Sequence, residues 1–461
     1  MKKTTLARFI SASCFLAACS NVTEQTRAVD TPTTIKPAVT LYHNTTLIDG
    51  TGVPAQSHRS ILVEGDRIRG IYPSDQLPAL DKNTKRVDAS EWYALPGLID
   101  THVHMATLPN DKVAKALLRR QIYSGVTSVR DMAGDGRALA NLARRTQLQE
   151  IPAPDLFYAA LMAGPSFFSD PRPGMSARGE TPGQVPWMQA ITEKTDMEEA
   201  VALARGSWAT GIKIYANLET QEVERIAAEA RKQGIQVWAH SMVFPALPNE
   251  VVAADVDVIS HVCRLSFEIS KKKPRQYHHK VVPDYASLDP AHPKILAIFK
   301  AMADKGIQLD ATVWLYEELA RMRREHPAAK TIPVKCPADF AARLTQVAYE
   351  QGVEISTGTD GMTPSSDLFP ALFKELEILA SKTQIPNAQL IRAATLNGAK
   401  VLGKESEFGS IEVGKKANLM FTRKNPLKNI EHLRTVELTL KSGKAYPRKE
   451  FKALGQSELK P

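Results

Sequence analysis

Two histidines with metal-ligand spacing end an apolar segment early in the chain. His102 and His104 close the segment that begins at Leu98. On an extended strand, residues two apart point to the same side, so both imidazoles could reach one divalent ion. A histidine pair with this spacing is weak evidence for a metal site on its own, so further candidate ligands are needed from later segments of the chain.

Four further polar residues occupy comparable positions in later segments. Lys213 lies inside an apolar segment, where an unpaired ammonium is costly, and His240, His261 and Asp360 each end one. Such residues come together when the segments are strands of one closed barrel, because the carboxyl ends of those strands meet at its mouth. Independent core polar residues would have no reason to share this placement.

Eight candidate strands carry this pattern. They are Leu98–His104, Thr127–Met132, Leu156–Ala163, Ile212–Ala216, Gln236–Ser241, Val256–Val262, Gly306–Val313 and Val353–Asp360. Helical patterns separate most of them, which is typical of parallel βα units. The sequence therefore predicts an α/β fold with a (β/α)8 TIM-type barrel over residues 96–406, closed by the helices Pro370–Ser381 and Asn387–Leu402.

Strand-like segments flank the predicted barrel on both sides. They occupy residues 39–95 and 407–450, and we expect them to pair into one small β-sandwich into which the barrel is inserted. The strands expected in the second block are Gly409–Val413, Ala417–Thr422, Val436–Lys441 and Lys444–Tyr446. Residues 451–461 would form a tail.

Three long loops are expected within the barrel. They span residues 164–195, 264–290 and 321–337. Two of them directly follow strands, so they would lie at the carboxyl-terminal face of the barrel, where substrate loops lie.

The first 18 residues are typical of an export signal. A basic start is followed by an apolar run from Phe9 to Ala18, which is shorter than a membrane-spanning helix. The run ends in Leu16-Ala17-Ala18-Cys19, which resembles a bacterial lipobox and implies cleavage before Cys19 and a lipid on its sulfur. An ordinary secretory signal is the alternative. Residues 19–38 would form a flexible tether.

The mature protein would thus be exported and anchored to a membrane by the lipid on Cys19. Ser20 follows that cysteine, and the lipoprotein resemblance then favours the outer membrane, facing the periplasm. Cys263 and Cys336 are the cysteines that remain, and the sequence leaves open whether they pair.

The composition excludes two classes of protein. Hydrophobic residues make up 43% and charged residues 24% of the 461-residue chain, which excludes disorder over its whole length. The net charge is +9, but no long Lys/Arg run occurs, so we expect no nucleic-acid partner. The sequence leaves the oligomeric state open, and a homo-oligomer is one of the alternatives.

The strand-end residues and their neighbours resemble the amidohydrolase superfamily of metal-dependent hydrolases. The resemblance rests on Pro96-Gly97-Leu98-Ile99-Asp100-Thr101-His102-Val103-His104, on Gly125-Val126-Thr127-Ser128-Val129-Arg130-Asp131 and on residues 409–419. It covers residues 39–446 and points to the imidazolonepropionase-like and Xaa-Pro-dipeptidase-like branch. Asn418 stands where relatives usually carry Asp, in the predicted sandwich and away from the chemistry.

The resemblance implies a site for two divalent metal ions, with zinc as the expected element. His102, His104 and Asp360 would hold one ion, and His240 and His261 the other. Lys213, carboxylated by CO2, would bridge both. The alternative for Lys213 is an ion pair with Asp360 beside a single metal.

The implied reaction is hydrolysis of an amide or cyclic amide C–N bond in a small molecule such as a dipeptide or an acyl amino acid. A hydroxide shared by the metals would attack the carbonyl, and Asp360 would carry a proton to the leaving nitrogen. Tyr215, Arg172 and Arg130 are candidate substrate contacts. Arg172 would suit a substrate carboxylate, whereas Arg130 is equally suited to a structural ion pair.

Two other functions stay open. The same site could serve a lactonase or a phosphotriesterase-type esterase, because the superfamily cleaves all three kinds of bond. A non-catalytic, metal-containing binding lipoprotein would use the barrel mouth for capture. Such a binder has no need for the proton shuttle that Asp360 would provide.

Overall fold

The computed structural model describes residues 37–459 except 108, 280 and 326–335. The predicted signal peptide, Cys19 and the tether up to residue 36 lie outside the described residues. Residues Ala38–Pro461 form one compact unit. In the described part of the chain, no helix is long and apolar enough to cross a membrane.

Eight parallel strands form the barrel, as the sequence predicted. They are β6 (Leu98–Val103), β7 (Val126–Asp131), β8 (Asp155–Ala163), β11 (Gly211–Ile214), β12 (Gln236–His240), β13 (Val258–Ser260), β14 (Gln308–Asp310) and β15 (Ile355–Ser356), paired in this order. Two backbone hydrogen bonds close the ring between the last strand and the first. The Thr101 N–H donates to the Thr357 carbonyl at 2.9 Å, and the Asp360 N–H donates to the His102 carbonyl at 2.9 Å.

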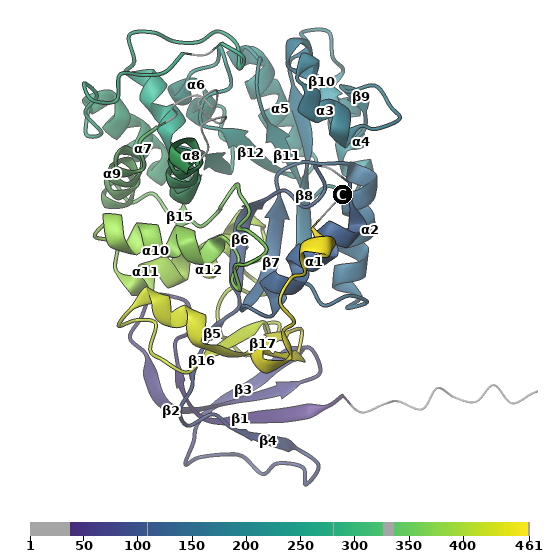
Figure 1. Cartoon of the computed structure of the whole chain (residues 1–461), viewed down its shortest axis with the longest axis vertical. Helices are drawn as coiled ribbons and strands as arrows, with labels where there is room; N and C mark the ends of the chain where they lie inside the picture. The colour runs from purple at the N-terminus through teal and green to yellow at the C-terminus, as the bar shows by residue number, and fades with distance from the viewer. Residues whose placement is uncertain (1–36, 108, 280, 326–335, 460–461) are drawn as a thin grey trace, which may run out of the picture. The chain divides into compact units, whose positions relative to one another are not determined.

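Helices surround the barrel (Figure 1). They are α1 (Asp111–Ile122), α2 (Gly136–Gln147), α4 (Met197–Gly206), α5 (Thr220–Lys232), α6 (Pro248–Ala253), α7 (Pro293–Lys305), α8 (Val313–Glu325), α9 (Ala338–Glu350), α10 (Leu372–Lys382), α11 (Asn387–Ala393) and α12 (Leu396–Val401). Helix α1 illustrates why they form. The Asn110 side chain caps its first turn by accepting the Val113 N–H, and Leu117, Leu118 and Ile122 form its buried face.

The two ends of the chain join in one eight-stranded sheet. Its order is β18-β17-β16-β5-β1-β2-β3, with β4 beside β1. The strands are β1 (Val39–Leu47), β2 (Gln56–Glu64), β3 (Arg67–Pro73), β4 (Lys85–Asp88), β5 (Tyr93–Pro96), β16 (Leu419–Thr422), β17 (Val436–Lys441) and β18 (Lys444–Pro447). The antiparallel pair β5–β16 connects the blocks on either side of the barrel.

This sheet curls around its own apolar core. Ile61 and Ile68 from one end share a buried cluster with Leu438 and Leu440 from the other. The two outer hairpin turns approach so closely that a Cβ on Gly443 would lie 1.9 Å from the Gly65 carbonyl oxygen, and Gly443 also has a φ of +74°. The small sandwich expected from the sequence is therefore one continuous, folded sheet.

Three expectations for local structure were wrong. Residues 409–413 form turns instead of a strand, because Gly409 (φ +99°) and Gly414 (φ +91°) break the extended chain. One expected helix is split into α11 and α12 at Thr395, whose backbone is not helical (φ −132°, ψ −87°). The segment 164–195 is an ordered insertion, with η1 (Pro165–Ser169), α3 (Pro171–Ser176), β9 (Gln184–Val185) and β10 (Met188–Ala190).

Buried aromatic side chains explain why the insertion is ordered. Phe167 and Trp187 pack into an apolar cluster above the barrel, and β10 adds to the end of β8. The expected loop 321–337 begins as the last turn of α8, and its residues 326–335 lie outside the described residues.

Cys263 and Cys336 form a disulfide, which answers the question that the sequence left open. Their Cα atoms are 6.0 Å apart. Cys263 lies in η2 (Val262–Glu268), just after β13, and Cys336 lies just before α9. The bridge therefore ties the segment that follows His261 to a helix of the outer ring.

We predict that reduction of this disulfide lowers the melting temperature. The bridge spans 73 residues. In the chain-entropy model, a crosslink of this length stabilises the folded state by roughly 4 kcal/mol through its restriction of the unfolded chain. Calorimetry with and without a thiol reductant measures the shift. The double variant C263A/C336A is the control. Its melting temperature should be close to that of the reduced protein, and addition of reductant should not change it. An unchanged melting temperature after complete reduction would contradict the prediction.

Candidate active site

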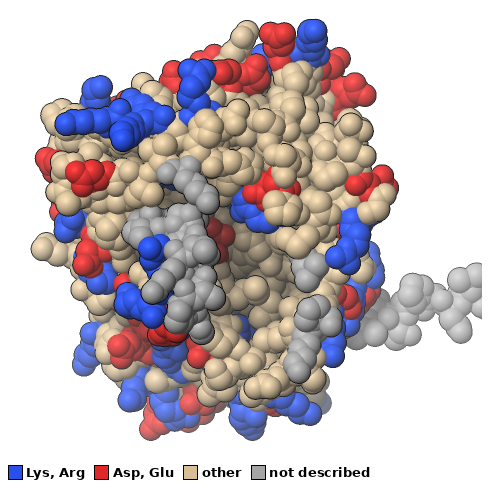
Figure 2. All heavy atoms as spheres, turned by 45° about the horizontal axis from the view of Figure 1, so that its top comes forward, with Lys and Arg blue, Asp and Glu red and all other residues tan. Residues whose placement is uncertain are grey.

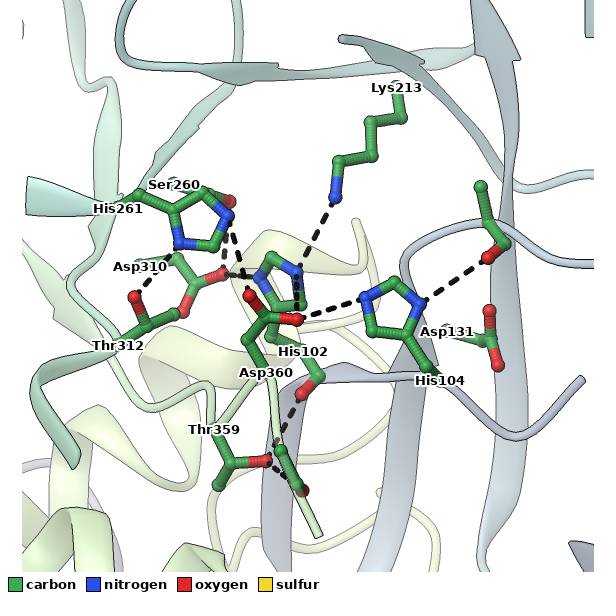
Figure 3. A network of polar contacts seen from close by, with 12 residues as sticks. His102, His104, Asp131, Lys213, Ser260, His261, Asp310, Thr312, Thr359 and Asp360 are labelled. Atoms are coloured by element: carbon green, nitrogen blue, oxygen red, sulfur yellow. Dashed lines mark hydrogen bonds and ion pairs between the residues drawn. The ribbon is translucent and has the colours of Figure 1, made fainter. Parts of the chain in front are cut away.

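The six predicted metal ligands converge at the carboxyl-terminal mouth of the barrel. His102, Lys213 and His240 lie on β6, β11 and β12, whereas the other three residues follow the ends of β6, β13 and β15. Figure 3 shows that His102, His104, Lys213, His261 and Asp360 point toward a common centre. Residues far apart in the sequence are thus brought together by closure of the barrel.

Asp360 is the centre of this cluster. Its carboxylate oxygens lie 3.0 Å from His104 Nε2, 3.6 Å from His102 Nε2 and 3.8 Å from His261 Nε2. The φ angles of Asp360 (+47°) and His261 (+71°) are in the left-handed region, which ordinary residues rarely adopt. Strained backbone of this kind is concentrated at functional sites, where it directs side chains inward.

Lys213 and His240 complete the cluster on the opposite side. Lys213 Nζ lies 3.4 Å from His102 Nε2 and is almost completely buried. The His240 ring centroid lies 5.0 Å from that of His261 and 4.2 Å from the Tyr215 ring. Burial lowers the pKa of Lys213 to about 8, although the nearby charge of Asp360 opposes the shift.

A buried carboxylate orients the first histidine. Asp310 accepts a hydrogen bond from His102 Nδ1 at 2.7 Å, which leaves Nε2 facing the centre. The same carboxylate accepts hydrogen bonds from Ser260 at 3.0 Å and from Arg130 at 3.1 Å. His261 is oriented comparably, because its Nδ1 lies 3.0 Å from the Thr312 hydroxyl oxygen.

Arg130 does not contact the cavity above the cluster, so its expected role as a substrate contact is not supported. Its side chain has no exposed surface, pairs with Asp310 and packs on the Trp238 ring at 4.7 Å. The alternative interpretation, a structural ion pair, fits this arrangement. Its neighbour in the sequence, Asp131, accepts a hydrogen bond from the Met105 N–H instead.

Three imidazoles of the cluster, those of His102, His240 and His261, are held in the neutral form that binds metals. Burial lowers the pKa values of His102, His240 and His261 well below the usual range. Burial alone would raise the pKa of Asp360, but the surrounding histidines outweigh it and hold that pKa well below the usual range. The site therefore combines neutral imidazoles with an ionised carboxylate, which are the protonation states of metal ligands.

The donor atoms fit a divalent metal ion. One ring nitrogen each of His102 and His261 and one oxygen of Asp360 lie within 4.8 Å of one another. In addition, the buried Nδ1 of His240 has no hydrogen-bond partner among the described residues, although such an atom normally has one. A metal ligand role would satisfy it. Imidazole and carboxylate donors suit zinc.

A cavity of about 1010 Å³ opens above the cluster. His104, Lys213, His240, His261 and Asp360 line its floor. Its walls include the apolar side chains of Leu161, Phe167, Met188, Phe244, Phe267 and Val281. Figure 2 looks into this hollow, and most of the wall that is visible there carries no charged side chain. The volume suits a small organic substrate.

Tyr215 and Arg172 both line this cavity, but the charge of Arg172 is already neutralised. Its Nε and Nη2 atoms each donate to a carboxylate oxygen of Asp170 at 2.9 Å, and Nη1 lies 3.3 Å from the Tyr215 hydroxyl. His278 also contacts Asp170, at 3.2 Å. Arg172 therefore holds the wall together rather than offering a free cation.

The sequence prediction missed three residues of the site: Asp170, Arg264 and Asp310. Asp310 ends the seventh barrel strand, so the strand-end rule that found the histidines could also have found it. Asp170 and Arg264 lie in segments without periodicity. Only the folded insertion and η2 place them at the cavity.

A closed (β/α)8 barrel with imidazoles and a carboxylate gathered at its mouth, below a substrate-sized cavity, is the architecture of a barrel enzyme. The chain belongs to the amidohydrolase family, whose model matches residues 93–446. The protein is therefore a hydrolase of that family.

Relatives by sequence include deaminases and an imidazolonepropionase. The 5-methylthioadenosine/S-adenosylhomocysteine deaminase of Thermoanaerobacter pseudethanolicus is 21% identical over 80% of this chain and 81% of its own. The imidazolonepropionase of Bdellovibrio bacteriovorus is 22% identical over 78% of this chain and 82% of its own. A shorter match, to the 5'-deoxyadenosine deaminase of Methanosarcina acetivorans, is 38% identical but spans only 23% of this chain and 26% of that protein.

The fold is also similar to solved structures. A Xaa-Pro dipeptidase with bound methionine in the active site superposes with a TM-score of 0.69 at 23% identity, covering 89% of this chain and all of that one. At this identity the likeness establishes the fold alone.

We predict that D310N lowers the affinity of the protein for zinc by about 10- to 100-fold, because the amide no longer fixes the His102 ring as the carboxylate does. Competition with a chromophoric chelator measures the affinity. S260A is the matched control: it removes another hydrogen bond to the same carboxylate but leaves His102 paired, so its effect should be much smaller. Equal affinities of D310N and the unaltered protein would refute the orienting role.

Proposed function

We propose that this hydrolase is metal-dependent and cleaves amide or cyclic amide C–N bonds of small molecules such as dipeptides or acyl amino acids. The observation that carries the proposal is the convergence of three imidazoles, Lys213 and Asp360 on the floor of one cavity, with the imidazole of His102 buried directly beside them. The substrate class is proposed by analogy with the Xaa-Pro dipeptidase of similar fold.

The ligand roles in this proposal are those that the resemblance to the amidohydrolase superfamily implies. His102, His104 and Asp360 would hold one divalent ion, and His240 and His261 a second, with carboxylated Lys213 between them. Bound ions would polarise the substrate carbonyl and lower the pKa of water toward neutrality. Burial favours the neutral amine of Lys213, which is the form that reacts with CO2.

The partial exposure of Asp360 supports a role in proton transfer. Its side chain is 21% exposed and lines the cavity, while its oxygens remain within reach of the cluster. We propose that its carboxylate accepts a proton from the attacking water and delivers that proton to the leaving nitrogen. An amine leaves poorly unless it is protonated, so a positioned acid is needed in this step.

The apolar walls and the floor have separate tasks in this proposal. The walls exclude water and bind the substrate body, whereas the floor binds the scissile carbonyl. Tyr215 lies next to His240 and is the candidate to contact the carbonyl group.

We also propose that the protein is exported and anchored through a lipid on Cys19, at the outer membrane facing the periplasm. The support is the sequence of the first 20 residues and the disulfide, since disulfides persist in oxidising compartments.

The test is a screen of N-acyl amino acids, dipeptides, lactones and phosphotriesters with purified protein, before and after chelation. We expect hydrolysis of amides in preference to esters, loss of turnover with chelator, and recovery with zinc. D360N should retain the fold and lower kcat by about 10²- to 10⁴-fold. Preferred cleavage of lactones or phosphotriesters would replace the proposed substrate class. Turnover that survives complete removal of metal, or normal turnover by D360N, would contradict the mechanism.

A further inference from the structure

Arg264 is a cation on the cavity wall that the proposed chemistry does not use. It lies in η2, three residues after His261, and its side chain lines the cavity. Its guanidinium carbon lies 5.2 Å from the Tyr277 ring centroid and 5.3 Å from that of Phe244. The contacts that hold it are thus aromatic faces, which fix its position without neutralising its charge.

No described carboxylate forms an ion pair with Arg264. It is half-buried and has no side-chain hydrogen bond to any residue in the described ranges, whereas Arg172, the other arginine of the described cavity lining, is paired with Asp170. A partly desolvated guanidinium without an anion is unfavourable, because both its charge and its five N–H donors lack partners. Binding of an anionic ligand would give the guanidinium a partner for its charge and acceptors for its N–H groups.

Among the described residues that line the cavity, the other Lys and Arg side chains have partners or proposed tasks. Arg172 makes two hydrogen bonds to Asp170. Lys213 lies among the imidazoles of the floor. Arg264 is therefore the arginine of the described cavity lining whose charge is available to a ligand.

The ring of Tyr277 contacts both Arg264 and a residue of the cavity floor. The Tyr277 ring packs against the Arg264 guanidinium and also stacks on the His240 ring, at a centroid distance of 6.3 Å and an interplanar angle of 16°. An anion on Arg264 would thus lie one aromatic ring away from a residue of the floor.

We propose that Arg264 is a specificity-determining residue that binds the carboxylate of an N-acyl amino acid or of the C-terminal residue of a dipeptide. The guanidinium forms two parallel hydrogen bonds to a carboxylate, which gives direction as well as affinity. Phe244 and Phe267, which also line the cavity, would receive the apolar side chain of the same residue. This inference rests on the proposed amide hydrolysis and names its substrate class.

The test compares a matched substrate pair, N-acetyl-L-phenylalanine and N-acetyl-L-phenylalaninamide, which differ in the carboxylate alone. The variants are R264M, R264K and R275M. Arg275 is the matched control, because it is 78% exposed, lies 3.9 Å from Glu219 and is not among the described residues that line the cavity. We expect R264M to lower kcat/KM about 10- to 100-fold more for the acid than for the amide, mainly through KM. R264K should retain part of the preference, and R275M should behave as the unaltered protein.

A binding measurement keeps this inference separate from the proposed reaction. Calorimetric titration with 3-phenylpropanoate and 3-phenylpropanamide needs no turnover. If the unaltered protein binds the acid more tightly than the amide and R264M does not, the result supports Arg264 as the carboxylate site. This holds even if neither acetyl substrate is cleaved. Equal binding of acid and amide by the unaltered protein, or an unchanged preference in R264M, overturns the inference. Turnover of the amide would then still support the hydrolase.

Discussion

The buried carboxylate of Asp310 connects the fold of the barrel to the chemistry of its mouth. It lies at the end of β14 and accepts hydrogen bonds from His102 on β6, Arg130 on β7 and Ser260 on β13. Four strands thus meet at one side chain. Because an isolated charge would be prohibitively costly at this depth, Asp310 and Arg130 depend on each other. The orientation of the His102 ring therefore depends on this pair.

The barrel and its ligands could be predicted because both depend on simple rules. Parallel strands alternate with helices, and polar residues that end such strands converge when the barrel closes. His240 and Asp360 could be found in this way, although they are 120 residues apart in the sequence. The folded terminal sheet could also be expected, since strand-like segments occur on both sides of the barrel. The turns at residues 409–413 could not, because a strand-like composition conceals the left-handed backbone at Gly409 and Gly414.

The roles of the residues in the cavity walls could not be predicted from such rules. Whether Arg172 or Arg264 offers a free charge depends on which one meets a carboxylate, and that contact is made by an insertion whose order comes from tertiary packing of Phe167 and Trp187. The role of Arg130 was ambiguous for the same reason: the residue ends a strand, as the ligands do, but its side chain points into the core and pairs with Asp310. Strand-end position identifies candidates, and only three-dimensional neighbours assign their roles.

The fold separates a floor built on strands from a wall built on the segments that follow them. The floor is built on strands and is held by buried hydrogen bonds, whereas the wall is built on the segments after β8 and β13. The disulfide adds a covalent constraint to the second of these segments, close to both His261 and Arg264. Such an arrangement allows the substrate to change while the hydrolytic centre is retained, which is common in barrel enzymes.

The most direct test of the account is the metal content per chain of the mature protein. The protein is purified without chelator and incubated with zinc and bicarbonate before the measurement. The account predicts about two equivalents of divalent metal, which a pair of ions bridged by carboxylated Lys213 requires. One equivalent would contradict the bridge and assign Lys213 to an ion pair with Asp360. A protein that binds no metal under these conditions would contradict the central claim.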